Sequence, residues 1–323
     1  MSPFSPTLSP HSQVFRDYTA PADQAISRHL EAHLRPLIAF LVQARPLAIS
    51  MGHAIRHLKL KISTLPPDTS DSEARDFMIA VIDNYIRNRI ELSDQLIAQH
   101  GCVKIVPEGD VILTFGHSGV VAKTLIHAHS EAKKRFRVIV VDSRPFLEGR
   151  VMLAKLVEAG IDCSYIHMNS VGHVMKEVTK VFLGAHGLFS NGALLSRVGT
   201  ATIALLSKNA NKPVIVCCET LKFSDHLQMD SIVYNEIGDP DTLVTSSLRH
   251  STNPNGRVLE NWRAMPNLKL LNVLYDVTPP EFISLVISEV GLIPVTSIPV
   301  VLREYNSSSS SANSTSGNNN NSY

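Results

Sequence analysis

The residues of this chain that could bind an anion are small residues and arginines that follow apolar runs. The stretch TFGHSG places Gly116, Ser118 and Gly119 directly after such a run, and the backbone N–H groups of small residues can approach a phosphate closely. The same residues suit an ordinary tight turn, so both interpretations stay open. Arg197, within Gly184–Thr200, can pair either with a phosphate or with a carboxylate on a neighbouring helix.

No standard nucleotide-binding or metal-binding motif accompanies these residues. The sequence contains neither G-x-G-x-x-G nor G-x-x-x-x-G-K-[ST]. His127 and His129 are two residues apart, a spacing that points them to different faces of a helix. The four cysteines have no C-x-x-C spacing. We therefore expect no metal and no cofactor, and we expect the cysteines to be buried and reduced.

The elements that come before these stretches have the periodicity of helices. Ser70 and Glu73 have the spacing of a capping box, which predicts that a helix begins there. Gly101 is well placed to end this helix in a left-handed conformation. A second helix is predicted over Met51–Ile62. Apolar residues at spacings near three and four form the predicted stripe of the first helix: Phe77, Val81, Tyr85, Ile86, Ile90 and Ile97.

From about residue 103 onward, short β-rich runs alternate with helical stretches. Most of these runs are almost continuously apolar, as strands covered on both faces of a parallel sheet are. A crossover helix is expected to begin with Thr278 as its N-cap and Pro279 as its first residue, and Glu281 completes the capping box. The predicted strands are Val111–Phe115, Arg137–Val141, Asp162–His167, Val181–Leu183, Pro213–Cys217, Leu270–Tyr275 and Pro299–Leu302.

The sequence thus predicts an α/β protein in which an N-terminal helical domain precedes a Rossmann-like parallel-sheet α/β domain, with disordered tails. We place the tails at residues 1–22 and 306–323, the helical domain at 23–102 and the α/β domain at 103–305. Lys and Arg total 30 against 29 Asp and Glu, a formal net charge of +1 that argues against direct nucleic-acid binding. With no signal peptide and no membrane-spanning window, a cytoplasmic protein without a membrane partner is expected.

Several stretches, taken together and in this order, resemble a known family. It contains the isomerases of methylthioribose-1-phosphate and ribose-1,5-bisphosphate, and the alpha, beta and delta regulatory subunits of eukaryotic translation initiation factor 2B. The resemblance covers roughly residues 25–303 and is closest to the delta regulatory subunits. The stretches that carry it are RPLAISMGHAI (45–55), GAHGLFSNG with SRVGTA (184–201), PVIVCCETLKF (213–223) and YDVTPPEFISLVISEVGLIPVTSIPVVLR (275–303).

The resemblance implies where a sugar-phosphate site would lie and how it has changed. The isomerases use a cysteine and an aspartate, and the matching positions of this chain read Gly116 and His186. A neutral glutamine that would meet the phosphorylated sugar has become Glu148. Because proton transfer needs an ionisable group within reach of the substrate, these changes imply a degenerate pocket and no catalytic residue. The residues of this pocket are Arg45, Gly116, Glu148, His186, Ser196 and Arg197.

The resemblance also implies a function without catalysis, that of a regulatory subunit of the guanine-nucleotide exchange factor for translation initiation factor 2. The implied partners are the beta, alpha, gamma and epsilon subunits of that exchange factor, and initiation factor 2 itself, whose phosphorylated alpha subunit would be sensed. The alternative is a sugar-phosphate isomerase or sensor that uses the degenerate pocket. Side chains expected at a subunit interface are Leu268, Leu271, Tyr275, Leu292 and Ile293.

Overall fold

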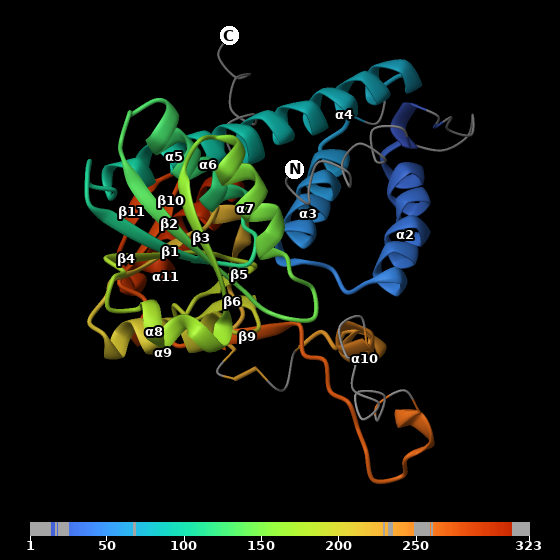
Figure 1. Cartoon of the computed structure of the whole chain (residues 1–323). Coiled ribbons are helices and arrows are strands. Elements are labelled where there is room, and N and C mark those ends of the chain that lie inside the picture. Colours follow the sequence, from blue (N-terminus) through green and yellow to red (C-terminus); the bar gives the residue numbers. More distant parts are fainter. Residues whose placement is uncertain are drawn as a thin grey trace.

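In the computed structural model, a helical region packs beside an α/β region that is built on a large sheet (Figure 1). The structure describes residues 14–16, 18, 26–66, 69–228, 230–231, 235–248, 259 and 261–311. These two regions confirm the predicted class, a helical region followed by a parallel-sheet α/β region. The domain boundary at residue 102 stays a prediction, because α5 (Leu92–Val103) spans it: this helix continues the rod of the helical region and packs into the core of the α/β region.

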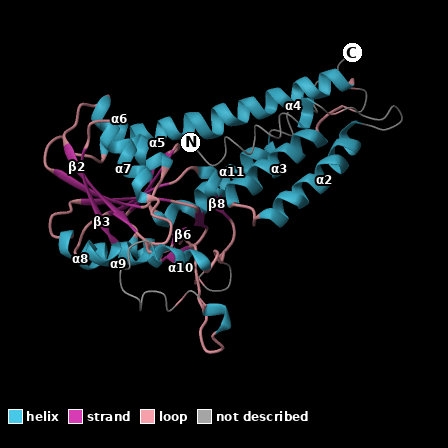
Figure 2. Ribbon diagram, turned by 45° about the vertical axis from the view of Figure 1, so that its right-hand side comes forward, coloured by secondary structure: helices cyan, strands magenta, loops and turns pink. Residues whose placement is uncertain are grey.

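The helical region begins one of its helices where the sequence predicts. The Ser70 hydroxyl accepts a hydrogen bond from the Glu73 backbone N–H, and the Glu73 carboxylate accepts one from the Ser70 N–H. This helix continues through a π-helical turn into α5, so that one long rod reaches onto the α/β region (Figure 2). The helices are α2 (Ile26–Ala44), α3 (Ile49–Ser63), α4 (Asp71–Ile86), the π turn (Arg87–Glu91) and α5.

Two details of the rod differ from the prediction. Gly101 does not end the helix but lies inside α5, where a Cβ would stand 2.4 Å from the methyl group of Thr124 on the neighbouring helix. The glycine therefore permits close helix packing rather than a left-handed turn. Phe77 is 42% exposed, whereas Met78 and Ile82 are buried. Since α4 carries apolar residues on two adjacent faces, periodicity alone could not choose the buried one.

The core of the helical region includes residues from a segment predicted to be disordered. Phe15 and Tyr18 are buried among side chains of α2, α3 and α4, so the tail prediction is wrong for these two residues. Asn306–Ser311, the start of the other predicted tail, is helical. The remaining tail residues, 1–13, 17, 19–22 and 312–323, lie outside the described residues. Leu221 of the α/β region joins this core and connects the two regions.

The main sheet of the α/β region has seven strands in the order β11-β10-β7-β4-β1-β2-β3. Its strands run parallel except β11, which pairs antiparallel with β10. β1, β2, β3, β4 and β7 confirm the first five predicted strands. The bounds are β1 (Asp110–Phe115), β2 (Phe136–Asp142), β3 (Asp162–His167), β4 (Lys180–Gly184), β7 (Val214–Cys217), β10 (Leu285–Ser288) and β11 (Gly291–Ile293).

Helices cover both faces of this sheet (Figure 1). In β1, Ile112 packs into the core under α5, α6 and α7, whereas Leu113 packs into the core under α8 and α9. Burial on both faces explains why these strands read as continuous apolar runs. The bounds of the helices not yet given are α6 (Gly119–Ser130), α7 (Gly149–Glu158), α8 (Val171–Val174), α9 (Thr200–Asn209) and α11 (Ile298–Ser311).

A second sheet of four strands, in the order β8-β5-β6-β9, was not predicted. Between β8 and β9 the chain makes an excursion that projects from the body of the protein (Figure 1, orange). We call residues 235–248 and 261–274 the arm. The elements of this part are β5 (Gly187–Phe189), β6 (Leu194–Arg197), β8 (Phe223–Ser224), α10 (Asp241–Leu248) and β9 (Tyr275–Thr278), with a 3-10 turn at Trp262–Ala264.

Two predicted strands are wrong. Leu270–Tyr275 lies almost wholly in the arm, where Val273 forms an isolated bridge to Ile237 and Leu271 is 67% exposed. An apolar run that leaves the body of the protein does not become a buried strand. Pro299–Leu302 is part of α11, in which Ile298 and Leu302 are buried four residues apart, the spacing of a helix face.

The predicted crossover helix at Thr278 is also wrong. Thr278 is the last residue of β9, and its buried hydroxyl has no hydrogen-bond partner among the described atoms, so it caps nothing. The prolines that follow produce a single 3-10 turn (Pro280–Phe282), after which β10 begins. The residues that suggested the start of a helix therefore form a turn between the two sheets.

The contrast between two helical glycines predicts opposite effects of the same substitution. Gly101→Ala is expected to destabilise the fold by about 1–2 kcal/mol, because overlap with the buried Thr124 methyl outweighs the helix propensity gained. Gly52→Ala in α3, where nothing lies within 4 Å of a Cβ, is expected to stabilise by about 0.5–1 kcal/mol. Urea denaturation measures both changes.

The Gly101→Ala, Thr124→Ser double variant is the control, since serine lacks the overlapping methyl and keeps the hydroxyl that donates to the Val120 carbonyl. Its stability should return towards that of the wild type. An equal loss in the single and the double variant would contradict the close-packing explanation.

Candidate functional site

The candidate site lies at the carboxyl ends of the central strands. The strand order reverses between β1 and β4, and in sheets of this kind ligands bind at such a switch point. Here the crevice is packed closed: a Cβ on Gly184 would stand 2.4 Å from the Ser118 side chain, and the Ser196 hydroxyl donates to the Gly184 carbonyl over 3.0 Å. Ser118 also caps α6 by accepting from the Val121 N–H. Ser118 of the TFGHSG stretch therefore acts as the N-cap of α6.

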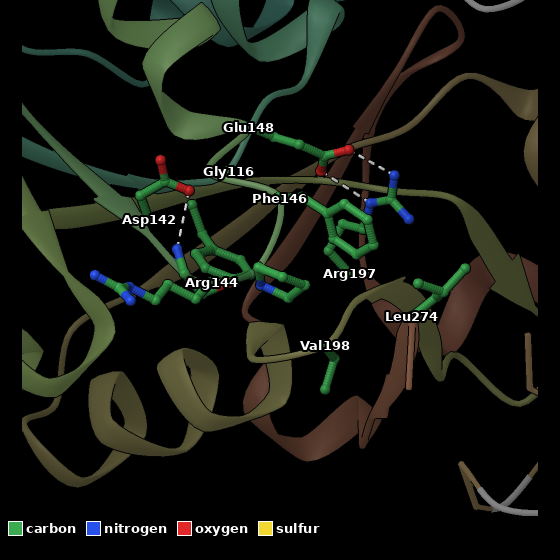
Figure 3. Close-up of a pocket in the computed structure, with 11 residues that line it drawn as sticks. Gly116, Asp142, Arg144, Phe146, Glu148, Arg197, Val198 and Leu274 are labelled. Carbon is green, nitrogen blue, oxygen red and sulfur yellow. Dashed lines mark hydrogen bonds and ion pairs between the residues drawn. The ribbon is translucent and has the colours of Figure 1, made fainter. Parts of the chain in front are cut away.

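A small pocket opens beside this crevice, between the loops that follow β1 and β2 and the end of β6 (Figure 3). Its free volume is about 20 Å³. One water molecule needs about 10–15 Å³ by this measure, so the pocket has room for little more than a single water. The lining residues are Phe115, Gly116, Asp142, Ser143, Arg144, Pro145, Phe146, Glu148, Arg197, Val198 and Leu274.

An ion pair between Glu148 and Arg197 forms part of the wall of this pocket (Figure 3). The Arg197 Nε donates to Glu148 Oε2 over 2.9 Å and Nη2 donates to Oε1 over 2.6 Å, a two-bond arrangement that is strong and geometrically specific. Glu148 precedes α7 and Arg197 ends β6. Of the two partners that the sequence left open for Arg197, the structure therefore has the carboxylate.

Aromatic rings enclose the arginine and connect it to the helical region. The Arg197 guanidinium carbon lies 5.7 Å from the Phe146 ring centre and 5.2 Å from that of Tyr275. The Tyr275 hydroxyl accepts from Arg45 Nη2 over 2.9 Å, and Arg45 Nε donates to Glu236 Oε2 over 3.1 Å. Contacts thus run from α7 through the pocket to the residue that follows α2.

His186 completes the site from the loop after β4. Its ring centre lies 4.3 Å from that of Tyr275, in a tilted arrangement. Burial, followed by the charges of Lys222, Arg197 and Arg45, lowers the pKa of His186 from 6.5 to about 4. At neutral pH the imidazole is therefore uncharged and a weak base, so it is poorly suited to accept a proton from a substrate.

Gly116, at the position that matches the cysteine of the isomerases, brings no functional group to the site. Its φ is +59°, its N–H donates to the Val141 carbonyl over 2.9 Å, and nothing lies within 4 Å of where a Cβ would be. The structure thus brings Gly116, Glu148 and Arg197 together in the pocket. His186 contacts Tyr275 beside them, Ser196 closes the crevice, and Arg45 reaches them through Tyr275.

Sequence reasoning missed three members of the site. Phe146 and Glu236 lie in loops that carry no pattern. Asp276 had a signal, a lone carboxylate in an apolar strand: its Oδ2 accepts from the N–H groups of Gly199 (2.7 Å) and Ala201 (3.0 Å) at the start of α9. Burial raises the pKa of Asp276 from 3.8 to about 6, against the opposing effect of these hydrogen bonds.

The five residues predicted at a subunit interface are placed differently from one another. Leu271 and Leu292 are exposed and Leu268 is half-buried, whereas Ile293 and Tyr275 are buried within the chain itself. Their role in an interface stays a prediction. Across the described ranges, no three His, Cys, Asp or Glu side chains are grouped so as to hold a metal ion. Within the same ranges, no helix has both the length and the apolar composition that a membrane crossing requires.

The buried Asp276 and His186 should give opposite pH dependences. The folded chain binds the Asp276 proton more tightly than the unfolded chain, so this contribution to the free energy of unfolding falls as pH rises from about 4 to 6. It binds the His186 proton more weakly, so that contribution rises between about 4 and 6.5. Each shift corresponds to roughly 3 kcal/mol, and the two largely cancel.

Each single variant should expose the other group's contribution. Asp276→Asn should gain stability as the pH is raised from about 4 to 6.5, and His186→Gln should lose stability from about 4 to 6. Urea titrations at several pH values measure these slopes relative to the wild type. Parallel slopes in the two variants would show that the assigned pKa shifts are absent.

Comparisons with known proteins identify the family. The model of the initiation factor 2 subunit family matches residues 10–295. Translation initiation factor eIF2B subunit delta of Schizosaccharomyces pombe is 49% identical over 90% of this chain, and that of Dictyostelium discoideum is 48% identical over 91%. The chain spans only 62% and 46% of the length of these two relatives.

The same comparisons include an enzyme and a solved complex. Ribose 1,5-bisphosphate isomerase of Pyrococcus furiosus is 31% identical over 86% of this chain and 82% of its own length. A chain in the crystal structure of the tetrameric eIF2B-beta2-delta2 complex from C. thermophilum aligns with a TM-score of 0.75 and 32% identity, covering 88% of this chain and 83% of that one. With a family model that matches most of its length, this chain belongs to the initiation factor 2 subunit family.

Proposed function

We propose that this chain is a non-catalytic regulatory subunit, of the delta type, of the guanine-nucleotide exchange factor for translation initiation factor 2. It assembles with the alpha, beta, gamma and epsilon subunits and senses the phosphorylated alpha subunit of initiation factor 2. The similarity to two delta subunits at 49% and 48% identity supports this proposal. The helical region is the part we assign to contact with the phosphorylated partner.

The observation that carries the proposal is the small pocket whose arginine is already paired with a carboxylate of the same chain. Where a sugar phosphate would have to bind, the side chains of Glu148 and Arg197 bind each other and leave about 20 Å³ free. A carboxylate in that place would repel a phosphate dianion at short range. The pocket is therefore unsuited to the substrates of the related isomerases.

The lack of side chains suited to exchange a proton with a substrate also supports a non-catalytic role. Isomerisation of an aldose to a ketose moves hydrogen between adjacent carbons, which requires groups that exchange a proton with the substrate. Gly116 has no side chain, and His186, with a pKa of about 4, is a weak base at neutral pH. Loss of both groups should lower the rate by many powers of ten.

The exposed apolar side chains of the arm are the surface we assign to subunit contact. Leu271 and Ile237 are more than two-thirds exposed, and Met265 is more than one-third exposed. Asp241 holds the arm together by pairing with Arg263 (2.7 and 2.8 Å) and accepting from Trp262 Nε1 (2.9 Å). A pre-ordered apolar surface of this kind suits a lasting contact with another subunit.

Reconstitution of the exchange factor with and without this chain tests the regulatory role. The complete complex should release nucleotide from initiation factor 2 and be inhibited when the alpha subunit of that factor is phosphorylated. Without this chain, assembly or inhibition should fail. Unchanged assembly together with unchanged inhibition would exclude the proposal.

A matched pair of variants localises the subunit contact. Leu271→Asp in the arm should weaken co-purification with the beta subunit without lowering the melting temperature, because the side chain is 67% exposed. Val157→Asp on α7, where the side chain is 57% exposed, is the control and should leave both unchanged. If the two variants co-purify equally well, the arm does not form this contact.

The isomerase alternative is tested by direct turnover, because a ribose 1,5-bisphosphate isomerase is 31% identical to this chain. The purified chain, incubated with ribose 1,5-bisphosphate or 5-methylthioribose 1-phosphate, should form no ketose above the background. The Pyrococcus furiosus enzyme serves as the positive control. Turnover that His186→Gln abolishes would establish an enzyme and overturn the non-catalytic assignment.

A further inference from the structure

The pocket raises the question of what Glu148 does there. Arg197 is one-third exposed and lies against the rings of Phe146 and Tyr275, so much of its charge has been removed from water. A guanidinium in such a place is stabilised by a nearby anion, and the two-bond pairing offered by a carboxylate or a phosphate suits its geometry. The anion that the structure provides is a side chain of the same polypeptide.

We infer that Glu148 is a built-in ligand: its carboxylate occupies the place on Arg197 that the phosphate group of a small molecule would take. A carboxylate and a phosphate offer the arginine fork the same pair of acceptor oxygens. Both oxygens of Glu148 are used in this way, at 2.9 and 2.6 Å. The pocket is thus self-occupied, and the fold does not require an external anion.

The position of Glu148 supports this assignment over an ordinary surface ion pair. Its carboxylate is one-third exposed and faces the pocket at the carboxyl edge of the sheet (Figure 3). It comes from the loop that follows β2, directly before α7, whereas Arg197 comes from another sheet. The Arg137–Glu177 pair is a useful contrast, because its arginine is as exposed as Arg197, whereas its glutamate is 56% exposed and lies away from the pocket-lining residues.

The built-in ligand also has a structural consequence outside the pocket. Arg197, once held by Glu148, supports the Tyr275 ring, whose hydroxyl binds Arg45 over 2.9 Å. Removing the carboxylate should therefore loosen the attachment of the residue after α2. This inference concerns the chain alone and does not depend on the proposed regulatory role.

Glu148→Ala tests the inference by chemical rescue, because it removes the carboxylate and opens the space beside Arg197 that a phosphate would need. In chloride buffer the variant should melt at a lower temperature than the wild type. Inorganic phosphate or ribose 5-phosphate should raise its melting temperature, and titration calorimetry should give a dissociation constant at least about tenfold lower than for the wild type. The wild type should not respond to millimolar phosphate.

Two variants control for non-specific effects. Glu177→Ala frees Arg137, whose side chain is as exposed as that of Arg197, in the same chemical way but outside the pocket, and it should create no phosphate response. The Glu148→Ala, Arg197→Gln double variant should lose the response, because the guanidinium is gone. A phosphate response of the wild type or of Glu177→Ala equal to that of Glu148→Ala would overturn the inference.

If Glu148→Ala is insoluble in chloride buffer, its yield on refolding becomes the measurement. Refolding in phosphate buffer should recover soluble protein, and refolding in chloride at the same ionic strength should not. Equal recovery in the two buffers would overturn the inference. Because these readouts involve neither nucleotide release nor other subunits, their failure would leave the proposed function untouched, and failure of the proposed function would leave them untouched.

Discussion

The charge of Arg197 is the constraint on which the whole site depends. Its side chain is 34% exposed, and its guanidinium lies near two aromatic rings that take part of its surface out of water. A charge in that position is stabilised by a partner with good geometry. A ligand-binding protein can let its ligand supply the counter-charge. Here Glu148 supplies it from within the chain, through two hydrogen bonds of 2.9 and 2.6 Å.

From this pair the contacts spread to the three parts of the molecule. Tyr275 lies against Arg197, exchanges backbone-to-side-chain hydrogen bonds with Asn235 at the base of the arm (3.2 and 2.7 Å), and binds Arg45. Arg45 in turn binds Glu236, the next residue of the arm. The α/β region, the arm and the helical region therefore meet at one polar joint. A joint of this kind helps to fix the relative orientation of the three parts.

The sequence predicted what depends on burial and missed what depends on contacts between distant residues. Val111–Phe115 reads as a strand because both of its faces are covered, and this physical cause is visible in the residues themselves. Pro299–Leu302 also contains β-branched residues, but it lies in α11, where Ile298 and Leu302, four residues apart, are buried on one face of the helix. In the site, the family resemblance located Glu148 and Arg197. Their pairing across 49 residues, however, leaves no local signal, and neither does the burial of Tyr275.

Several polar groups of the crevice are paired within the chain. The Gly184 carbonyl accepts from Ser196, the first N–H groups of α9 bind Asp276, and Arg197 binds Glu148. In an enzyme, some of these groups would have to remain free for a substrate, at a cost in stability. Satisfying them internally removes that cost but also removes the binding site. The internal pairing of these groups therefore favours a stable fold over an open binding site, whereas Leu271 and Ile237 of the arm keep their apolar side chains exposed.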